Sequence, residues 1–291
     1  MKLIDLDECV LNALELFQKT KLPKLKHNFK RPLVVGSMNA ALTGQIIMQD
    51  TDAVFADEGT FEEKLNTVKG IDGCLLLSAS GKKHAPVIAK AVKKRGIKVI
   101  LITNNDTAPA KAIAHETIIL PKNVEPFTYN TSTYMGMILT KTKEDPKKIL
   151  AHINKIKNKI PNMKKYKAFY LIIPEEFPSI RDMFLTKFDE LFGPMLTCRC
   201  WSYETTKHAK TVIPWDKELF ISFGHENKIF GKNRYNVPLP KGASYATLMA
   251  VGYYVIGQIQ KDNPAYFKKN IVAFTKAASK LFGSDIQPIV K

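Results

Sequence analysis

The sequence has few cysteines and no long apolar run. Four cysteines among 291 residues do not provide a disulfide framework for a chain of this length. Cys198 and Cys200 are separated by one residue, and no second pair stands at zinc-finger spacing, so we interpret them as alternate positions of a strand. No apolar stretch reaches the roughly 18 to 20 residues that a membrane-spanning helix needs. These absences exclude a disulfide-stapled scaffold, and they predict neither a structural metal site nor a membrane partner.

The first residues also lack the pattern of a secretory signal. They read MKLIDLDECVLNALELF, with acidic residues and apolar side chains at helical spacing. We therefore expect an N-terminal amphipathic helix and a cytoplasmic protein.

Acidic residues are scarce relative to basic ones, which gives a formal net charge of +17. The excess peaks in Lys141–Lys167, where ten lysines accompany two acids. This stretch has a single interleaved aromatic residue, Tyr166, and no recognisable nucleic-acid reader motif. Solvated lysine-rich faces, whose field would also attract anionic sugars, are the more common explanation. Nucleic acid is therefore not an expected partner.

The first half alternates short apolar runs with helix-length segments. Such a rhythm is typical of a parallel sheet with helices on both faces. The predicted strands are Pro32–Val35, Ala53–Phe55, Gly73–Leu77, Lys98–Thr103 and Thr117–Leu120.

One strand end has the residues of an anion site. The apolar run Cys74–Leu77 passes directly into Ser78, Ala79, Ser80 and Gly81, and a helical pattern begins near Lys83. Hydroxyl groups, backbone N–H groups and the positive end of a helix dipole converge at such a turn. We predict that this loop binds the phosphate of a small metabolite. The alternative is an ordinary strand-to-helix turn with serine as the N-cap.

Two further loops follow predicted strands in the same way. The loop Gly36–Asn39 carries Ser37 and Asn39, and the loop 104–107 follows Thr103. Ligands of open parallel sheets bind at the carboxyl ends of the strands, near the point where the strand order reverses. We therefore expect these hydroxyl and amide groups to share one crevice with Ser78 and Ser80.

The second half repeats the α/β rhythm. Its predicted strands are Lys167–Ile173, Thr197–Trp201 and Glu218–Phe223, and a long apolar helix spans Ser244–Gln260. We therefore predict two α/β domains, 1–150 and 151–291, of which the first carries the phosphate loop.

The order of strand, Gly-Ser turn, helix, Ser-x-Ser-Gly loop and "ILIT" strand resembles the sugar isomerase (SIS) domain. The second half resembles another SIS domain, so the closest architecture is that of double-SIS phosphosugar isomerases. The isomerase half of glucosamine-6-phosphate synthase and the bifunctional phosphoglucose/phosphomannose isomerases are built this way. The resemblance runs from about Arg31 to Ala277 and implies two doubly wound, flavodoxin-like sheets.

The resemblance also implies roles for individual residues. Ser78, Ser80 and Gly81 match the family's phosphate loop, whereas Lys83 replaces its last hydroxyl residue and can compensate by charge. Further expected contacts to the sugar phosphate come from Ser37, Asn39, Thr103 and Glu125.

The family's chemistry comes mainly from the second domain. By resemblance, His208 opens the sugar ring, Glu190 moves a proton between C1 and C2, and Lys269 assists ring opening or stabilises charge. Asp189 and Lys268 are the alternatives for the last two roles. A carboxylate base, a histidine and a lysine suit a reaction through an enediolate.

The resemblance predicts a phosphosugar-binding aldose–ketose isomerase that needs no cofactor and forms a homodimer. Two alternatives remain: a deaminase or deglycase that acts on an amino-sugar phosphate, and a non-catalytic sugar-phosphate sensor. Only about 30 residues precede the first predicted strand, too few for the glutaminase half of a synthase.

Overall fold

The computed structural model describes residues 3–290, which form two compact units. The unit called here the N-sheet unit contains Lys19–Asn123 and Ser132–Lys143. The other, the C-sheet unit, contains residues 3–18, Val124–Thr131 and 144–290. The predicted division at residue 150 falls inside a helix, and the contacts group the N-terminal helix with the second sheet.

The N-sheet unit is a five-stranded parallel sheet in the order β2-β1-β3-β4-β5. This is the flavodoxin order, in which β2 is added on one side of β1 and the later strands are added on the other side, starting with β3. Strands β1, β3 and β4 are buried along their whole length, as expected of parallel strands covered on both faces. The strands are β1 (Pro32–Val35), β2 (Val54–Ala56), β3 (Gly73–Leu77), β4 (Val99–Thr103) and β5 (Glu116–Ile119).

Helices cover both faces of this sheet. On one face, α3 (Phe61–Thr67), α4 (His84–Lys94) and the 3₁₀ turn η1 (Pro109–Ala112) form a common apolar core with the strands. On the other face lies α2 (Asn39–Met48), whose Gly44 sits against Val34 and Leu77 so closely that a Cβ atom would approach the Val34 side chain to 2.7 Å. Helix α5 (Thr131–Thr142) completes the unit.

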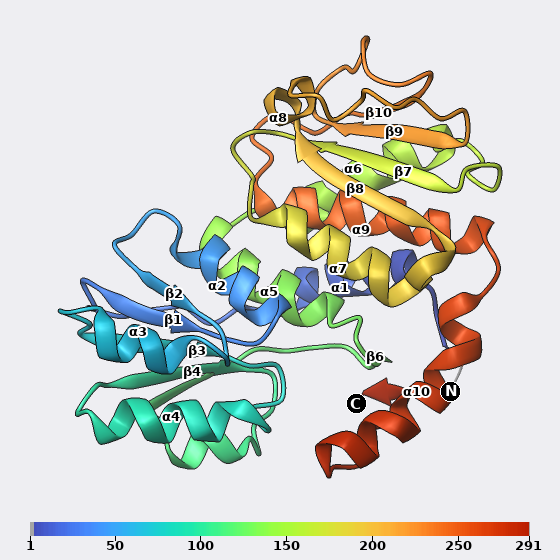
Figure 1. The fold of residues 1–291 in the computed structure, drawn as a ribbon. Helices are drawn as coiled ribbons and strands as arrows, with labels where there is room; N and C mark the ends of the chain where they lie inside the picture. Colours follow the sequence, from blue (N-terminus) through green and yellow to red (C-terminus); the bar gives the residue numbers. More distant parts are fainter. Residues whose placement is uncertain (1–2, 291) are drawn as a thin grey trace. The chain divides into compact units, whose positions relative to one another are not determined.

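The C-sheet unit is built on a four-stranded parallel sheet in the order β10-β9-β7-β8. Helices α7 and α9 pack together beneath it (Figure 1). The Phe184 ring of α7 lies 5.8 Å from Phe223 of β9 and fits against Gly252 of α9. The strands are β7 (Ala168–Ile173), β8 (Thr197–Ser202), β9 (Glu218–Phe223) and β10 (Asn233–Val237), and the helices are α7 (Ile180–Phe192), α8 (Tyr203–Lys207) and α9 (Tyr245–Asp262).

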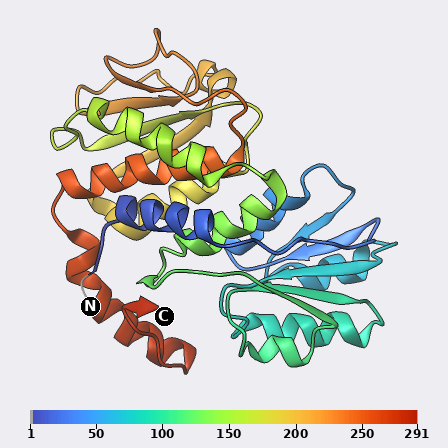
Figure 2. The same cartoon turned by 180° about the vertical axis from the view of Figure 1, so that it is seen from behind.

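Two further helices pack against α9: in the view from behind in Figure 2, α1 lies below α9, away from the sheet, and α6 lies above it. Helix α1 (Leu6–Lys19) is held there because the Leu6 N–H donates to Gln260 and Asp7 pairs with Lys261 at 2.6 Å. Helix α6 (Pro146–Ile156), followed by the 3₁₀ turn η2 (Lys157–Lys159), is the second. The chain ends in α10 (Tyr266–Phe282) and β11 (Ile289–Val290), which pairs antiparallel with β6 (Glu125–Pro126).

The predicted fold class, an α/β chain with parallel sheets flanked by helices, is confirmed. Cys198 and Cys200 do occupy alternate positions of strand β8. The segment between β6 and α5 is not helical: α5 starts only at Thr131, because the positive φ angles of Thr128 (76°) and Asn130 (46°) are incompatible with a helix. Over residues 3–290, no helix combines the length and the apolar character that crossing a membrane requires.

Candidate functional site

The carboxyl edge of the N-sheet contains the point where the strand order reverses. Strands β1 and β3 are neighbours there, and the helices that follow them, α2 and α4, lie on opposite faces of the sheet. Such a divergence leaves a crevice at which open α/β sheets bind their ligands. The loops that border it are residues 36–38, after β1, and residues 78–83, after β3.

The loop after β3 is folded by its own serines. The Ser78 Oγ accepts a hydrogen bond from the Gly81 N–H at 3.1 Å, and the Ser80 Oγ accepts one from the Lys82 N–H at 3.3 Å. Within the described residues, neither hydroxyl donates a hydrogen bond. Both hydroxyl hydrogens are therefore available to the oxygen atoms of an anion.

The neighbouring loop after β4 fixes this shape. Thr103, which is fully buried, donates through its hydroxyl to the Ala79 carbonyl at 3.0 Å and accepts from the Asn105 N–H at 3.2 Å. The Asn105 side chain donates in turn to the Ser80 carbonyl at 2.8 Å. Thr103 thus adjoins the loop after β3, and its hydroxyl holds the backbone of that loop; a contact of Thr103 with phosphate stays a prediction.

Gly81 allows the loop to approach its neighbour closely. Its φ angle is 61°, which favours glycine, and a Cβ atom at this position would lie 2.4 Å from the Cβ of Ala108. No other residue type fits without moving the loop after β4.

The residues just before α2 and α4 share an unusual backbone conformation. Met38 has φ 47° and ψ −120°, and Lys83 has φ 46° and ψ −112°. This region is otherwise nearly restricted to glycine, and strained residues of this kind cluster at functional sites, each at a cost of about 1–3 kcal/mol. Partial burial also lowers the pKa of Lys83 below its usual value. Nothing in the residue types of Met38 or Lys83 signals this geometry.

The loop after β1 contributes a buried acceptor. Asn39 begins α2 and is only 4 % exposed, yet its side-chain Oδ1 has no hydrogen-bond partner within residues 3–290. Ser37 is half-buried, and its carbonyl accepts from the Ala40 N–H. The predicted residues Ser37, Asn39, Ser78, Ser80, Gly81, Lys83 and Thr103 therefore all lie at one edge of one sheet.

Glu125 belongs to the other unit. It is buried in β6 of the C-sheet unit, and its carboxylate accepts from the Thr131 N–H at 2.6 Å, at the start of α5. The carboxylate thereby caps a helix, and a direct contact between Glu125 and a sugar stays a prediction.

Glu190 pairs with a buried lysine that the sequence analysis did not single out. The Lys187 side chain on α7 is fully buried, and its ammonium donates to the carbonyls of Thr128 (3.0 Å) and Tyr129 (3.1 Å). The Glu190 carboxylate, 24 % exposed, is its third acceptor at 2.6 Å. The rings of Tyr129 and Tyr253 lie 5.6 and 5.5 Å from the same ammonium. Lys187 therefore ties the segment 128–129 to α7.

The three predicted catalytic residues are not gathered in one place. Helix α7 leads into the amino end of β8, so Glu190 lies near that edge of the C-sheet. His208 follows α8, at the carboxyl end of the same strand, and is exposed. A six-residue strand such as β8 spans about 20 Å. Lys269 is exposed on α10, and its neighbour Lys268 pairs with Asp5 at 2.8 Å.

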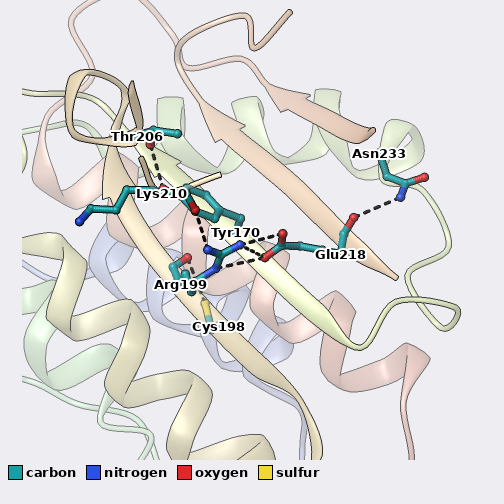
Figure 3. A network of polar contacts seen from close by, with 7 residues as sticks. All are labelled: Tyr170, Cys198, Arg199, Thr206, Lys210, Glu218 and Asn233. Carbon is teal, nitrogen blue, oxygen red and sulfur yellow. Dashed lines mark hydrogen bonds and ion pairs between the residues drawn. The ribbon is translucent and has the colours of Figure 1, made fainter. Parts of the chain in front are cut away.

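The side of the C-sheet that faces away from α7 carries a charged network (Figure 3). Arg199 of β8 binds both carboxylate oxygens of the buried Glu218 at 2.6 and 2.8 Å, and its guanidinium lies over the Tyr170 ring. The Tyr170 hydroxyl donates to Thr206 at 3.2 Å. The Arg199–Glu218 ion pair and the contact of Arg199 with Tyr170 join β7, β8 and β9.

The described residues contain no cluster suited to a metal ion: no three His, Cys, Asp or Glu side chains between positions 3 and 290 are placed to hold one. Cys198 and Cys200, the closest pair in sequence, belong to the C-sheet unit, and burial raises the pKa of both thiols. A thiol with a raised pKa is a poor metal ligand at neutral pH.

Comparison with known proteins gives matches in structure only. No family model and no curated protein sequence matches the chain. Glucosamine-6-phosphate deaminase from Thermotoga maritima matches with a TM-score of 0.62 and 11 % identity, over 88 % of this chain and 91 % of that one. A phosphosugar isomerase described as putative, from Clostridium difficile 630, matches with a TM-score of 0.59 and 14 % identity, over 89 % and 91 %. Tagatose-6-phosphate ketose/aldose isomerase from Escherichia coli matches with a TM-score of 0.58 and 11 % identity, over 88 % and 86 %. At these identities the likeness is one of fold.

Proposed function

We propose that this chain binds a phosphorylated sugar at the carboxyl edge of the N-sheet and interconverts its aldose and ketose forms. The observation that carries the binding proposal is the pair of loops at the β1/β3 divergence. Each loop ends in a strained residue, Met38 or Lys83, directly before a helix. The structural likeness to enzymes named for phosphorylated sugars supports the substrate class.

The groups at this edge suit the two ends of a sugar phosphate. The hydroxyls of Ser78 and Ser80 are free to donate to phosphate oxygens, and the positive end of α4 with Lys83 favours negative charge. Asn39 offers a buried carbonyl oxygen, which is the partner that a sugar hydroxyl needs. Binding would satisfy this acceptor, which otherwise carries the cost of an unmade hydrogen bond.

The reaction itself requires a base that removes a proton alpha to a carbonyl and returns it to the neighbouring carbon. Glu190, His208 and Lys269 are the residues proposed for proton transfer, ring opening and charge stabilisation. Each proton-transfer group typically contributes about 10²–10⁴-fold to the rate. Glu190 faces the Lys187 ammonium at 2.6 Å, which holds the carboxylate in a fixed position.

A panel of phosphorylated aldoses and ketoses tests both parts of the proposal. Calorimetric titration measures binding, and NMR of the incubated sugars detects interconversion. We expect Ser78→Ala/Ser80→Ala to lose binding and the exposed Ser284→Ala, in the other unit, to retain it. The binding proposal fails if no sugar phosphate binds the natural chain, and the isomerase proposal fails if sugars bind without interconversion.

A second candidate is a sugar-phosphate sensor without turnover. The separation of Glu190 and His208 at opposite ends of β8, together with the ion pair of Glu190, favours it. Tight binding without any chemical change of the sugar is the result expected of such a sensor.

A third candidate shares the ring-opening step with the isomerase but releases ammonia from an amino-sugar phosphate. The fold likeness to glucosamine-6-phosphate deaminase favours it. An ammonia assay on amino-sugar phosphates in the same panel distinguishes this activity from isomerisation.

A further inference from the structure

The excess positive charge of the chain is concentrated in one short segment. Residues 146–167, called here the lysine segment, contain eight lysines and no aspartate or glutamate. The whole chain has a formal net charge of +17, so this segment carries almost half of the excess. The lysines are Lys147, Lys148, Lys155, Lys157, Lys159, Lys164, Lys165 and Lys167.

The fold turns all of these lysines outward. Ile149, Ile153 and Ile156 form the buried face of α6, which packs against α9. Each of the eight lysines is exposed, on α6, on η2 or on the loop that leads to β7. None of them forms an ion pair with any residue that the structure describes, whereas Lys207, Lys228 and Lys261 elsewhere in the same unit do.

The carboxylates nearest in sequence or contact do not neutralise this face. Asp145 accepts from the Lys147 backbone N–H at 2.9 Å and caps α6. Asp262 of α9 accepts from the Met163 backbone N–H at 2.6 Å. Glu144, just before the segment, likewise accepts from backbone N–H groups, those of Ser244, Ala246 and Thr247. Within the described residues none of these three carboxylates forms an ion pair with a lysine of the segment, and the eight ammonium groups outnumber them.

Two kinds of extended polyanion present enough negative charge to match such a face: a nucleic acid and an anionic lipid surface. Peripheral membrane helices combine basic residues with apolar side chains that enter the bilayer. The described chain does have exposed large apolar side chains, but none of them lies in the lysine segment. A backbone of phosphates, which lysines contact without any apolar insertion, fits the segment better.

The sequence alone does not favour nucleic acid as a partner, but the exposure of all eight lysines and their lack of ion pairs within the described residues do. We propose that the lysine segment binds the phosphate backbone of nucleic acid without regard to sequence. The side chains contact phosphates as separate point charges, because lysine lacks the planar fork with which arginine reads a base edge. The affinity then comes from counterion release and falls steeply with salt. This binding is independent of the sugar-phosphate site, which lies in the N-sheet unit.

Fluorescence anisotropy with a labelled random duplex of about 20 base pairs tests the proposal over about 50–200 mM salt. The natural chain should bind with a dissociation constant on the order of micromolar at the lowest salt, with a steep log–log salt slope. The variant Lys148→Gln/Lys155→Gln/Lys159→Gln should bind about tenfold more weakly or worse, and its salt slope should be flatter by up to about 3.

A matched variant removes three exposed lysines outside the segment: Lys241→Gln/Lys276→Gln/Lys280→Gln. It should keep nearly the affinity and slope of the natural chain, and tryptophan fluorescence should show that both variants remain folded. Equal losses in the two variants would overturn the proposal, because net charge and not the segment would then govern binding. It is also overturned if the duplex does not bind, including the case in which vesicles of anionic lipid bind instead.

Discussion

Replacing Lys187 with methionine should destabilise the C-sheet unit strongly. The change keeps most of the side-chain volume but removes the ammonium that donates to the Thr128 and Tyr129 carbonyls and to Glu190. The Tyr129 carbonyl then remains buried without a donor, and the segment 128–129 loses its tie to α7.

The contacts allow the loss to be estimated. Breaking a buried ion pair by removing one partner costs about 3–5 kcal/mol, and an unsatisfied buried carbonyl costs about 1–3 kcal/mol. Glu190 is 24 % exposed and the Thr128 carbonyl is only partly buried, so water solvates part of what Lys187 leaves. The free energy of unfolding should therefore fall by about 3 kcal/mol, near the lower end of the range for a buried pair.

Tryptophan fluorescence during urea unfolding measures this loss in the relevant unit, since both tryptophans of the chain, Trp201 and Trp215, lie in the C-sheet unit. With a denaturant slope of about 2 kcal/mol per molar, the midpoint should drop by about 1.5 M. The exposed Lys276→Met on α10 is the control and should change stability by less than about 0.5 kcal/mol. A loss below about 1 kcal/mol, or one equal to that of the control, would refute the assigned role of Lys187.

Three further predictions concern the sites. Glu190→Gln should retain sugar-phosphate binding while abolishing turnover if Glu190 is the base; turnover near the natural rate in an NMR assay would leave it only its ion-pair role. Gly81→Ala should weaken ligand binding and lower the stability of the N-sheet unit by about 1–3 kcal/mol, because its Cβ would lie 2.4 Å from that of Ala108. The control Gly96→Ala, with a similar φ and open space around it, should cost less and leave binding intact; equal thermal shifts of the two variants would contradict this reasoning. Burial lowers the pKa of Lys83, so its ammonium loses its proton at a lower pH than that of an ordinary lysine, and phosphate binding should weaken as the pH rises towards that pKa. The variant Lys83→Arg should keep its affinity at alkaline pH; identical calorimetric pH profiles for the two proteins would disprove the involvement of this charge.

The fold class was predictable because the buried strands can be recognised from the sequence alone. Strands β3 and β4 read GCLLL and VILIT, continuous apolar runs that parallel sheets require, and each is followed by a helical pattern. Helix α6 is not among the elements predicted from the sequence. Asp145 and Pro146 are typical of a helix start and Ile149 and Ile153 have helical spacing, but the many lysines between them make the segment resemble a solvated linker.

The candidate site was predictable only in part. The position of Ser78 and Ser80 follows from where a buried strand ends, and the structure keeps both at the carboxyl edge. The backbone strain at Met38 has no sequence signal, because neither methionine nor lysine favours a positive φ.

Lys187 did leave a signal, since it interrupts the apolar stripe formed by Met183, Phe184, Phe188 and Leu191 on α7. A lysine is expected to point to solvent, and its burial depends on carbonyls some 60 residues earlier in the chain. The role of Glu190 as the partner of this lysine follows from that distant contact and is not visible from the helix alone.

The division of the chain has a consequence for its synthesis. Residues 19–143 supply the whole N-sheet unit, so this unit can fold while the ribosome is still making the rest. Helix α1, which precedes the N-sheet unit in the chain, packs against α9, where the Asp7 backbone meets Gly257. Its apolar face, including Leu6, Val10 and Leu14, must stay without its partner until most of the chain has emerged. Helix α1 is thus synthesised before the N-sheet unit but docks after it, and during that delay its apolar face is exposed to aggregation or to a chaperone.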